Sequence, residues 1–131
     1  MALILLIDDD DGWRTVLREV LRLEGHEVLE GFNGTHGVEL CHEFHPDLVI
    51  TDIVMPDKEG LETIGEIRLD FPDTPIIAMS GGGDFIRKED YLPMAQQMGA
   101  CATLPKPMSR EVLLDAVRAA LANRGTAPGA A

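Results

Sequence analysis

The chain has 131 residues, which is the size of one domain and short for two. Its 23 acidic residues outnumber its 11 basic residues, and the formal net charge is −12. Such a surface repels phosphate backbones and anionic lipid headgroups, so the composition argues against a nucleic-acid-binding protein and against a membrane-surface protein. The charge fits a protein partner that carries a basic patch, or a cation that is attracted by clustered carboxylates.

The first apolar run, residues 1–7, is too short for a membrane span and lacks the positive flank of a signal peptide. We therefore expect a cytoplasmic protein. In that compartment we expect Cys41 and Cys101 to be small buried residues rather than a disulfide. Cys41, His42 and His45 are an incomplete ligand set for structural zinc, so their spacing favours one face of a helix.

In the first half of the chain, apolar runs alternate with segments of helical spacing. Residues 2–7 are continuously apolar and predict a buried strand, whereas residues 27–30 are short and flanked by charge and indicate an edge strand. Between them, Gly25 closes a helix whose apolar stripe we expect in the core. That stripe consists of Trp13, Val16, Leu17, Val20 and Leu21, and the next helix is marked by Val38, Cys41 and Phe44 or His45.

The second half of the chain repeats this alternation. Residues 47–52, 75–79 and 101–104 predict three more strands. The helices between and after them are marked by Leu61, Ile64 and Ile67, by Tyr91, Met94, Ala95 and Met98, and by Val112, Leu113, Ala116, Val117, Ala120 and Leu121. Gly60 and Phe71 bound the first of these helices. Ser109 is a good cap for the last one, whose stripe we also expect in the core.

Strands that alternate with helices imply an α/β fold, a doubly wound parallel sheet with helices on both faces. We expect one folded domain over residues 1–122. The tail, residues 123–131, has too little apolar surface to offset the entropy of ordering it, so we expect it to be disordered. We expect no output domain after it.

Polar side chains follow the expected strands at the points where the strands end. Asp8 and Asp9 follow the first strand, Asp52 ends the third, Ser80 follows the fourth and Lys106 follows the fifth. The carboxyl ends of parallel strands meet at one edge of a sheet, where open α/β sheets bind ligands. Each residue alone is weak support, since acidic caps, loop serines and solvated lysines are common, but their joint placement indicates a site.

Three gathered carboxylates need a counter-charge. Two like charges about 4 Å apart repel by roughly 4 kcal/mol at an effective dielectric constant of about 20. Mg²⁺ prefers such carboxylates together with water and phosphoryl oxygens, and a carboxylate beside it can act as a nucleophile toward phosphorus. Lys106 would then pair with the new negative charge, and Ser80 would donate a hydrogen bond to a phosphoryl oxygen.

Four motifs resemble the receiver domain of bacterial two-component response regulators, in particular single-domain regulators of the chemotaxis type. The resemblance covers roughly residues 2–122. The motifs are Ile7-Asp8-Asp9-Asp10, Thr51-Asp52-Ile53-Val54-Met55-Pro56 with Gly60 after it, Ala78-Met79-Ser80, and Pro105-Lys106-Pro107. The resemblance implies a flavodoxin-like sheet with strand order 2-1-3-4-5.

The resemblance also implies a function in a phosphorelay. Asp52 would accept a phosphoryl group from a histidine kinase or a phosphotransfer protein, and the phosphorylated domain would act on a downstream protein target. Asp8, Asp9 and Asp52 would hold Mg²⁺ with the backbone carbonyl of Val54. The chain would be a signalling switch rather than an enzyme, because it promotes only its own phosphorylation and dephosphorylation.

The resemblance assigns the sensing of the phosphoryl group to Ser80 and Lys106, and it implies a cis peptide bond between Lys106 and Pro107. Thr103 departs from the family pattern, because Tyr or Phe usually stands there and turns inward on activation. Ser80 and Thr103 are therefore the switch positions, without the usual aromatic coupling. Glu59, where the family commonly has Asp, is a milder departure.

Two alternative functions stay open at this point. A receiver-like interaction module that is not phosphorylated would keep the fold, and Thr103 leaves room for it, although the full acidic set argues against it. An aspartyl-phosphate phosphohydrolase would carry a second Asp two residues after its nucleophile as an acid and base. Val54 occupies that position, so this enzyme class is disfavoured.

Overall fold

The computed structural model describes residues 2–53, 60–81, 97 and 99–123. Its strands are β1 Leu3–Ile7, β2 Glu27–Gly31, β3 Leu48–Asp52, β4 Ile76–Gly81 and β5 Ala102–Lys106. Its helices are α1 Asp11–Leu23, α2 Gly34–Phe44, α3 Gly60–Asp70 and α5 Arg110–Ala122. The helix expected around residues 91–98 and the tail after residue 123 lie outside the described residues.

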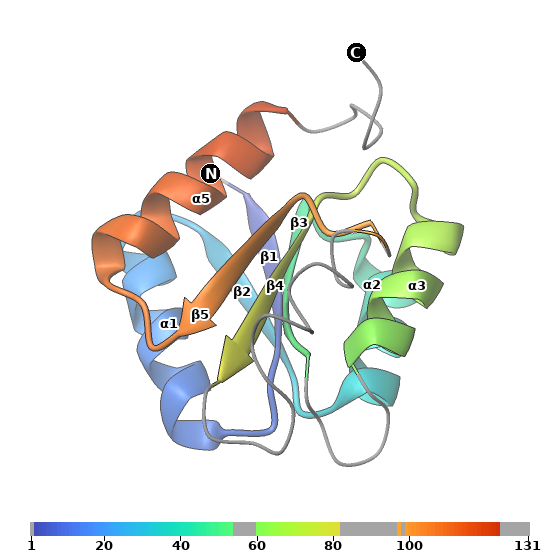
Figure 1. Cartoon of the computed structure of the whole chain (residues 1–131), viewed down its shortest axis with the longest axis horizontal. Coiled ribbons are helices and arrows are strands. Elements are labelled where there is room, and N and C mark those ends of the chain that lie inside the picture. Colours follow the sequence, from blue (N-terminus) through green and yellow to red (C-terminus); the bar gives the residue numbers. More distant parts are fainter. Residues whose placement is uncertain (1, 54–59, 82–96, 98, 124–131) are drawn as a thin grey trace.

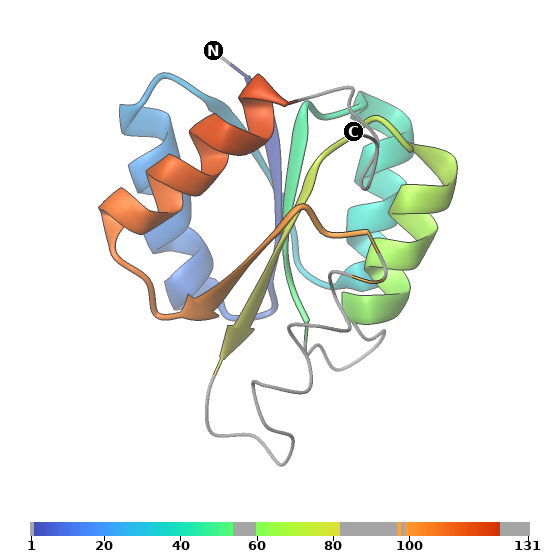
Figure 2. The ribbon, with the colours of Figure 1, turned by 45° about the horizontal axis from the view of Figure 1, so that its top comes forward.

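The five strands form one parallel sheet in the order β2-β1-β3-β4-β5. This order confirms the expected flavodoxin-like topology, and it confirms the edge position that the sequence predicts for residues 27–30. Figures 1 and 2 show α1 and α5 on one face of the sheet and α2 and α3 on the other face. None of the described helices has the length and apolar composition that a transmembrane segment requires.

The core has two parts because successive residues of a strand point to opposite faces of the sheet. Ile4 and Leu6 of β1 pack in the cluster that includes α1 and α5, whereas Leu5 and Ile7 pack in the cluster that includes α2 and α3. All four side chains are fully buried. A continuously apolar strand is therefore required at the centre of this sheet, as the sequence predicts for β1.

The helix ends follow from the residues that cap them. The Oδ1 atom of Asp10 accepts a hydrogen bond from the backbone N–H of Trp13 at 3.1 Å, and the Oγ atom of Ser109 accepts one from Val112 at 3.1 Å. Gly25 follows α1 with a φ of 90°, a conformation that glycine adopts at low cost. The predicted cap at Ser109 is confirmed, and Asp10 caps α1 in the same way.

Two expectations about burial are wrong. Cys101 is exposed rather than buried, because it precedes the edge strand β5, which has a neighbouring strand on one side only. Both cysteines are free thiols, in agreement with the sequence. Val16 and Val112 are also exposed, at 51% and 45%, although the apolar stripes assign them to the core. They lie at the margins of their stripes.

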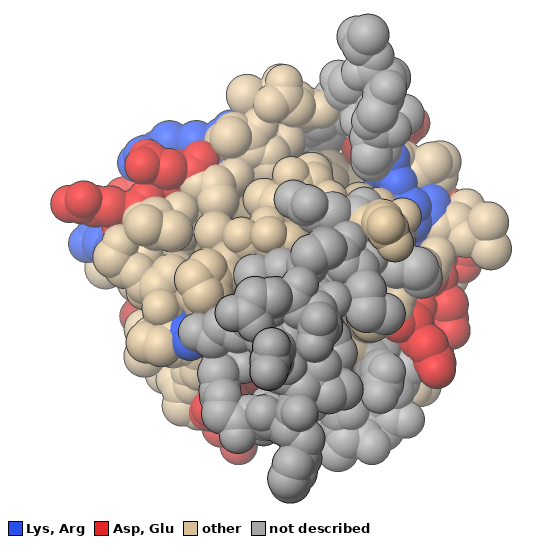
Figure 3. Space-filling view, viewed as in Figure 1, with Lys and Arg blue, Asp and Glu red and all other residues tan. Residues whose placement is uncertain are grey.

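Surface ion pairs connect the two helices on one face of the sheet. Glu24, after α1, lies 3.2 Å from the guanidinium of Arg110 and 3.5 Å from that of Arg118, both on α5. Figure 3 shows acidic and basic side chains side by side along this margin of the molecule. Exposed pairs of this kind contribute at most about 1 kcal/mol each, so the apolar core rather than this surface holds α5 in place.

Candidate functional site

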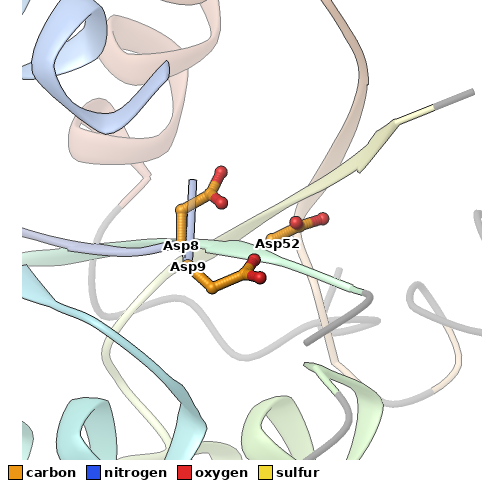
Figure 4. A group of neighbouring side chains, drawn as sticks. All are labelled: Asp8, Asp9 and Asp52. Carbon is orange, nitrogen blue, oxygen red and sulfur yellow. The ribbon is translucent and has the colours of Figure 1, made fainter. Parts of the chain in front are cut away.

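Three carboxylates meet at the carboxyl edge of the sheet. Asp8 and Asp9 follow β1, Asp52 is the last residue of β3, and β1 and β3 are adjacent. One carboxylate oxygen from each of the three residues lies within 4.8 Å of the others (Figure 4). Asp8 and Asp52 are buried, whereas Asp9 is exposed to solvent. The cluster is therefore anchored in the sheet and open on one side.

Lys106 supplies a positive charge to this cluster. Its Nζ atom lies 3.0 Å from Oδ2 of Asp8 and 3.0 Å from Oδ2 of Asp52. Burial disfavours the ammonium, but the charges of Asp52 and Asp8 outweigh this effect and raise the pKa of Lys106. For Asp8, burial outweighs the hydrogen bonds and raises the pKa of the carboxyl group. Lys106 thus stays charged and bridges two buried carboxyl groups.

Asp8 forms hydrogen bonds through its backbone N–H, its backbone carbonyl and its side chain. Its N–H donates to the carbonyl of Gly31 at 3.1 Å, and its Oδ1 atom accepts from the N–H of Asp10 at 2.9 Å. Its carbonyl oxygen accepts a hydrogen bond from Nη1 of Arg14 at 2.7 Å. Asp8 is consequently joined to β2, to the turn before α1 and to α1 itself.

Two polar residues from the neighbouring strands complete the region. Ser80 of β4 is buried, and its register partner is Pro105, next to Lys106. Thr103 of β5 is half-buried and pairs with Ala78 of β4, three positions before the lysine. The structure therefore brings Ser80 to the strand end beside Lys106, while Thr103 lies deeper in the sheet. The peptide bond between Lys106 and Pro107 is cis, as the resemblance implies.

Gly60 lies so close to the backbone of Asp52 and Ile53 that only glycine fits at this position. Its N–H donates to the carbonyl of Ile53 at 2.6 Å. A Cβ atom at this position would lie 2.1 Å from the carbonyl oxygen of Asp52 and 2.4 Å from Cα of Ile53. The start of α3 therefore packs directly against the backbone that carries Asp52. Val54, whose carbonyl the resemblance assigns to the metal, lies outside the described residues.

Arg14 is a residue of this region that none of the four motifs contains. The interpretation of α1 as an amphipathic helix places charged residues in solvent, yet Arg14 is 6% exposed and contacts the backbone of Asp8. A signal was present in the spacing, because Arg14 lies three and seven residues before Leu17 and Leu21, the two other buried residues of α1. A charged residue in phase with an apolar stripe indicates a buried ionic contact.

The donor set fits a hard divalent cation. Carboxylate oxygens are the ligands that Mg²⁺ prefers, and an exposed member such as Asp9 leaves space for the waters that this ion retains. The ammonium of Lys106, 3.0 Å from Asp8 and from Asp52, adds a second positive charge that balances the three carboxylates. Asp8, Asp9 and Asp52 could therefore hold Mg²⁺.

The fold and this site define the receiver class of response regulators, which are signalling switches of two-component systems. Residues 4–118 match the family described as the response regulator receiver domain, and the chain belongs to this family. It is 35% identical over 114 residues to the chemotaxis protein CheY of Halobacterium salinarum, covering 87% of this chain and 92% of that one. It is 40% identical over 129 residues to the DNA-binding transcriptional regulator NtrC of Azospirillum brasilense.

Solved structures agree with this assignment. A response regulator receiver domain protein from Clostridium thermocellum has a TM-score of 0.85 and 31% identity, with 93% of this chain and 95% of that chain covered. The relatives differ in length. The alignment with the NtrC relative covers 98% of this chain but only 26% of that protein.

Proposed function

We propose that this receiver domain accepts a phosphoryl group on Asp52 from the phosphohistidine of a histidine kinase or a phosphotransfer protein. One observation carries the proposal. The buried carboxylate of Asp52 lies within 4.8 Å of those of Asp8 and Asp9 and 3.0 Å from the ammonium of Lys106. An acceptor carboxylate needs positive charge beside it to bring an anionic phosphoryl group close, and Lys106 and the Mg²⁺ that the three carboxylates would hold supply that charge.

In the transfer step, an oxygen of Asp52 attacks the phosphorus atom. The P–O bond forms as the P–N bond to the donor histidine breaks, and the bonding electron pair returns to the imidazole nitrogen. Asp8, Asp9 and Asp52, with the carbonyl of Val54, would hold Mg²⁺, which when bound neutralises charge on the phosphoryl oxygens. Asp8 and Asp9 would thus place the ion beside the acceptor oxygen of Asp52.

Lys106 and Ser80 act on the product. The ammonium of Lys106 pairs with the negative charge that the phosphoryl group adds to Asp52. The hydroxyl of Ser80, buried at the end of β4, donates a hydrogen bond to a phosphoryl oxygen. Ser80 and Thr103 lie on adjacent strands, so a displacement of Ser80 toward the phosphoryl group alters β4 and β5 together and switches the surface that meets a downstream protein target.

The extent of the domain and its place of action are part of the proposal. Residues 1–122 form the receiver domain, which is supported by the end of α5 at Ala122 and by the packing of α5 on the sheet. The domain acts in the cytoplasm. The net charge of −12 favours protein partners with basic surfaces over nucleic acid.

Intact-mass analysis after treatment with a small phosphodonor tests the proposal. The wild-type chain is expected to gain the mass of one phosphoryl group in the presence of Mg²⁺, and to gain far less when the ion is chelated. The variant Asp52→Asn is expected to gain none. Asp115→Asn, on the exposed side of α5, is the matched control and should be labelled like the wild type.

Two results would overturn this assignment. Full labelling of Asp52→Asn would remove Asp52 as the acceptor. A wild-type chain that resists both a phosphodonor and a panel of histidine kinases would instead support the receiver-like interaction module that is not phosphorylated.

A further inference from the structure

Arg14 is a buried cation that joins separate parts of the fold. It projects from the first turn of α1 and is 6% exposed. Its Nη1 atom donates to the backbone carbonyl of Asp8 at 2.7 Å, and its Nε atom donates to Oε1 of Glu30 on β2 at 3.0 Å. Its guanidinium carbon lies 4.7 Å from the centre of the Phe32 ring. The side chain thus connects α1, β2 and the end of β1.

A buried guanidinium is stable only when its charge and its N–H groups are matched. Asp11 and Glu30 provide two ion pairs, and the carbonyl of Asp8 takes a further N–H. Glu30 is itself fixed, because its other oxygen accepts from Arg18 at 2.9 Å. The planar, forked donor set of arginine allows these contacts in different directions, which a lysine ammonium cannot reproduce with the same geometry.

The contacts of Arg14 constrain the direction of the Asp8 side chain. The N–H of Asp8 is bonded to Gly31, and its carbonyl is bonded to Arg14, so both backbone polar groups of this residue are held. Asp9 is the next residue and shares that peptide unit. The orientation of both carboxylates therefore depends on a peptide plane that Arg14 fixes.

We propose that Arg14 is a positioning residue, which holds the backbone of Asp8 so that the Asp8 and Asp9 carboxylates converge with Asp52 on a divalent cation. This inference rests on the proposed function, because it concerns the affinity of the same site for Mg²⁺. Arg14 acts through the backbone and does not touch the cation. Glu30 anchors Arg14 in the required orientation.

The sign of the effect separates positioning from simple electrostatics. A positive charge next to the site repels Mg²⁺, so removal of Arg14 would tighten binding if only charge mattered. If Arg14 positions the carboxylates, its removal weakens binding. A purely structural role predicts a lower unfolding temperature without a change in the affinity of the folded protein.

The experiment compares Arg14→Met, Arg14→Lys and the control Arg18→Met. Arg18 also binds Glu30, but no contact joins it to Asp8 among the described residues. Mg²⁺ binding is measured by calorimetry and by the fluorescence of Trp13, the single tryptophan of the chain, at a temperature where all variants are folded. Residues that orient metal ligands typically change affinity by about tenfold or more.

The inference predicts that Arg14→Met raises the Kd for Mg²⁺ by about tenfold, that Arg14→Lys gives an intermediate value, and that Arg18→Met changes the Kd by less than about twofold. An unchanged or lower Kd in folded Arg14→Met would overturn it. If Arg14→Met does not fold, an unchanged Kd in Arg14→Lys has the same meaning.

The proposed function and the inference can fail separately. A wild-type chain that binds Mg²⁺ and is labelled on Asp52, with equal affinity in the Arg14 variants, would overturn the inference alone. A wild-type chain that does not bind Mg²⁺ would overturn the metal site and the inference together.

Discussion

Lys106 and Asp52 are 54 residues apart in the sequence, yet the Nζ atom of Lys106 lies 3.0 Å from Oδ2 of Asp52. The same Nζ atom lies 3.0 Å from Oδ2 of Asp8. The side chains of Asp8 and Asp52 are 0% and 7% exposed, so water provides little of their stabilisation. The ammonium of Lys106 is therefore the counter-charge that allows two buried carboxyl groups to lie side by side.

Replacement of Lys106 by Met should destabilise the protein when no divalent ion is present. The change leaves two buried carboxyl groups without their shared donor, and a lost partner of this kind costs about 1–3 kcal/mol. Mg²⁺ should restore part of that loss, because it supplies positive charge at the same place. Urea unfolding with and without Mg²⁺ measures both effects.

Arg118→Met, which removes exposed ion pairs only, should change the free energy of unfolding by less than about 1 kcal/mol. Equal stability of Lys106→Met and the wild type would contradict this interpretation.

Substitution of Gly60 by Ala tests the close contact between α3 and the end of β3. The added Cβ atom would lie 2.1 Å from the carbonyl oxygen of Asp52, and backbone must shift to admit it. We expect a loss of at least about 2 kcal/mol in the free energy of unfolding.

The matched control is Gly12→Ala, where the nearest atom that a Cβ would meet is 3.5 Å away. In that helix position alanine should be neutral or stabilising by about 0.5 kcal/mol. Similar unfolding curves for the two variants would refute the steric argument.

His26 should make the stability depend on pH. Burial lowers the pKa of His26 below its ordinary value of 6.5, and its Nδ1 atom accepts a hydrogen bond from the N–H of Ala2 at 3.1 Å. The folded protein therefore favours the neutral ring, and the unfolded chain binds more protons as the pH falls through 6.5. This contribution to stability is present above that pH and is lost below it, toward the lower pKa of the folded state.

Urea unfolding at about pH 7.5 and about pH 5.5 measures the effect of His26. The variant His26→Gln retains an acceptor for Ala2 but does not titrate, so the stability of the variant should fall less between the two pH values than that of the wild type. The other histidines are common to both proteins and cancel in the difference. An equal or larger fall in the variant would show that His26 does not carry this dependence.

The parallel sheet and the gathering of Asp8, Asp9 and Asp52 follow from the sequence pattern, whereas the strand order follows from the resemblance to receiver domains. Alternation of apolar runs and helical stripes is decisive for a parallel sheet, and parallel strands deliver the residues at their carboxyl ends to one edge. Lys106 follows from the same rule. These residues are predictable because local pattern and topology together determine their places, without any knowledge of side-chain contacts.

The role of Arg14 and the exposure of Cys101 were not predictable in this way. The spacing of Arg14 with Leu17 and Leu21 indicates burial, but the partners of Arg14 do not follow from its helix, because they are Glu30, 16 residues away, and the backbone carbonyl of Asp8. Cys101 begins the apolar run that predicts the fifth strand, but the edge strand β5 starts one residue later, at Ala102, and Cys101 lies before it. The partners of a buried ion and the exact first residue of a strand depend on tertiary contacts, which the local sequence does not specify.

The position of the phosphoryl group is the most direct test of the central claim. After treatment with a phosphodonor and Mg²⁺, borohydride reduces an aspartyl phosphate to homoserine, and peptide mass spectrometry identifies the altered residue. The account predicts homoserine in place of Asp52 in the wild-type chain, with Asp8 and Asp9 unaltered. Homoserine in place of Asp8 or Asp9, or a stable phosphate on Ser80, would contradict it.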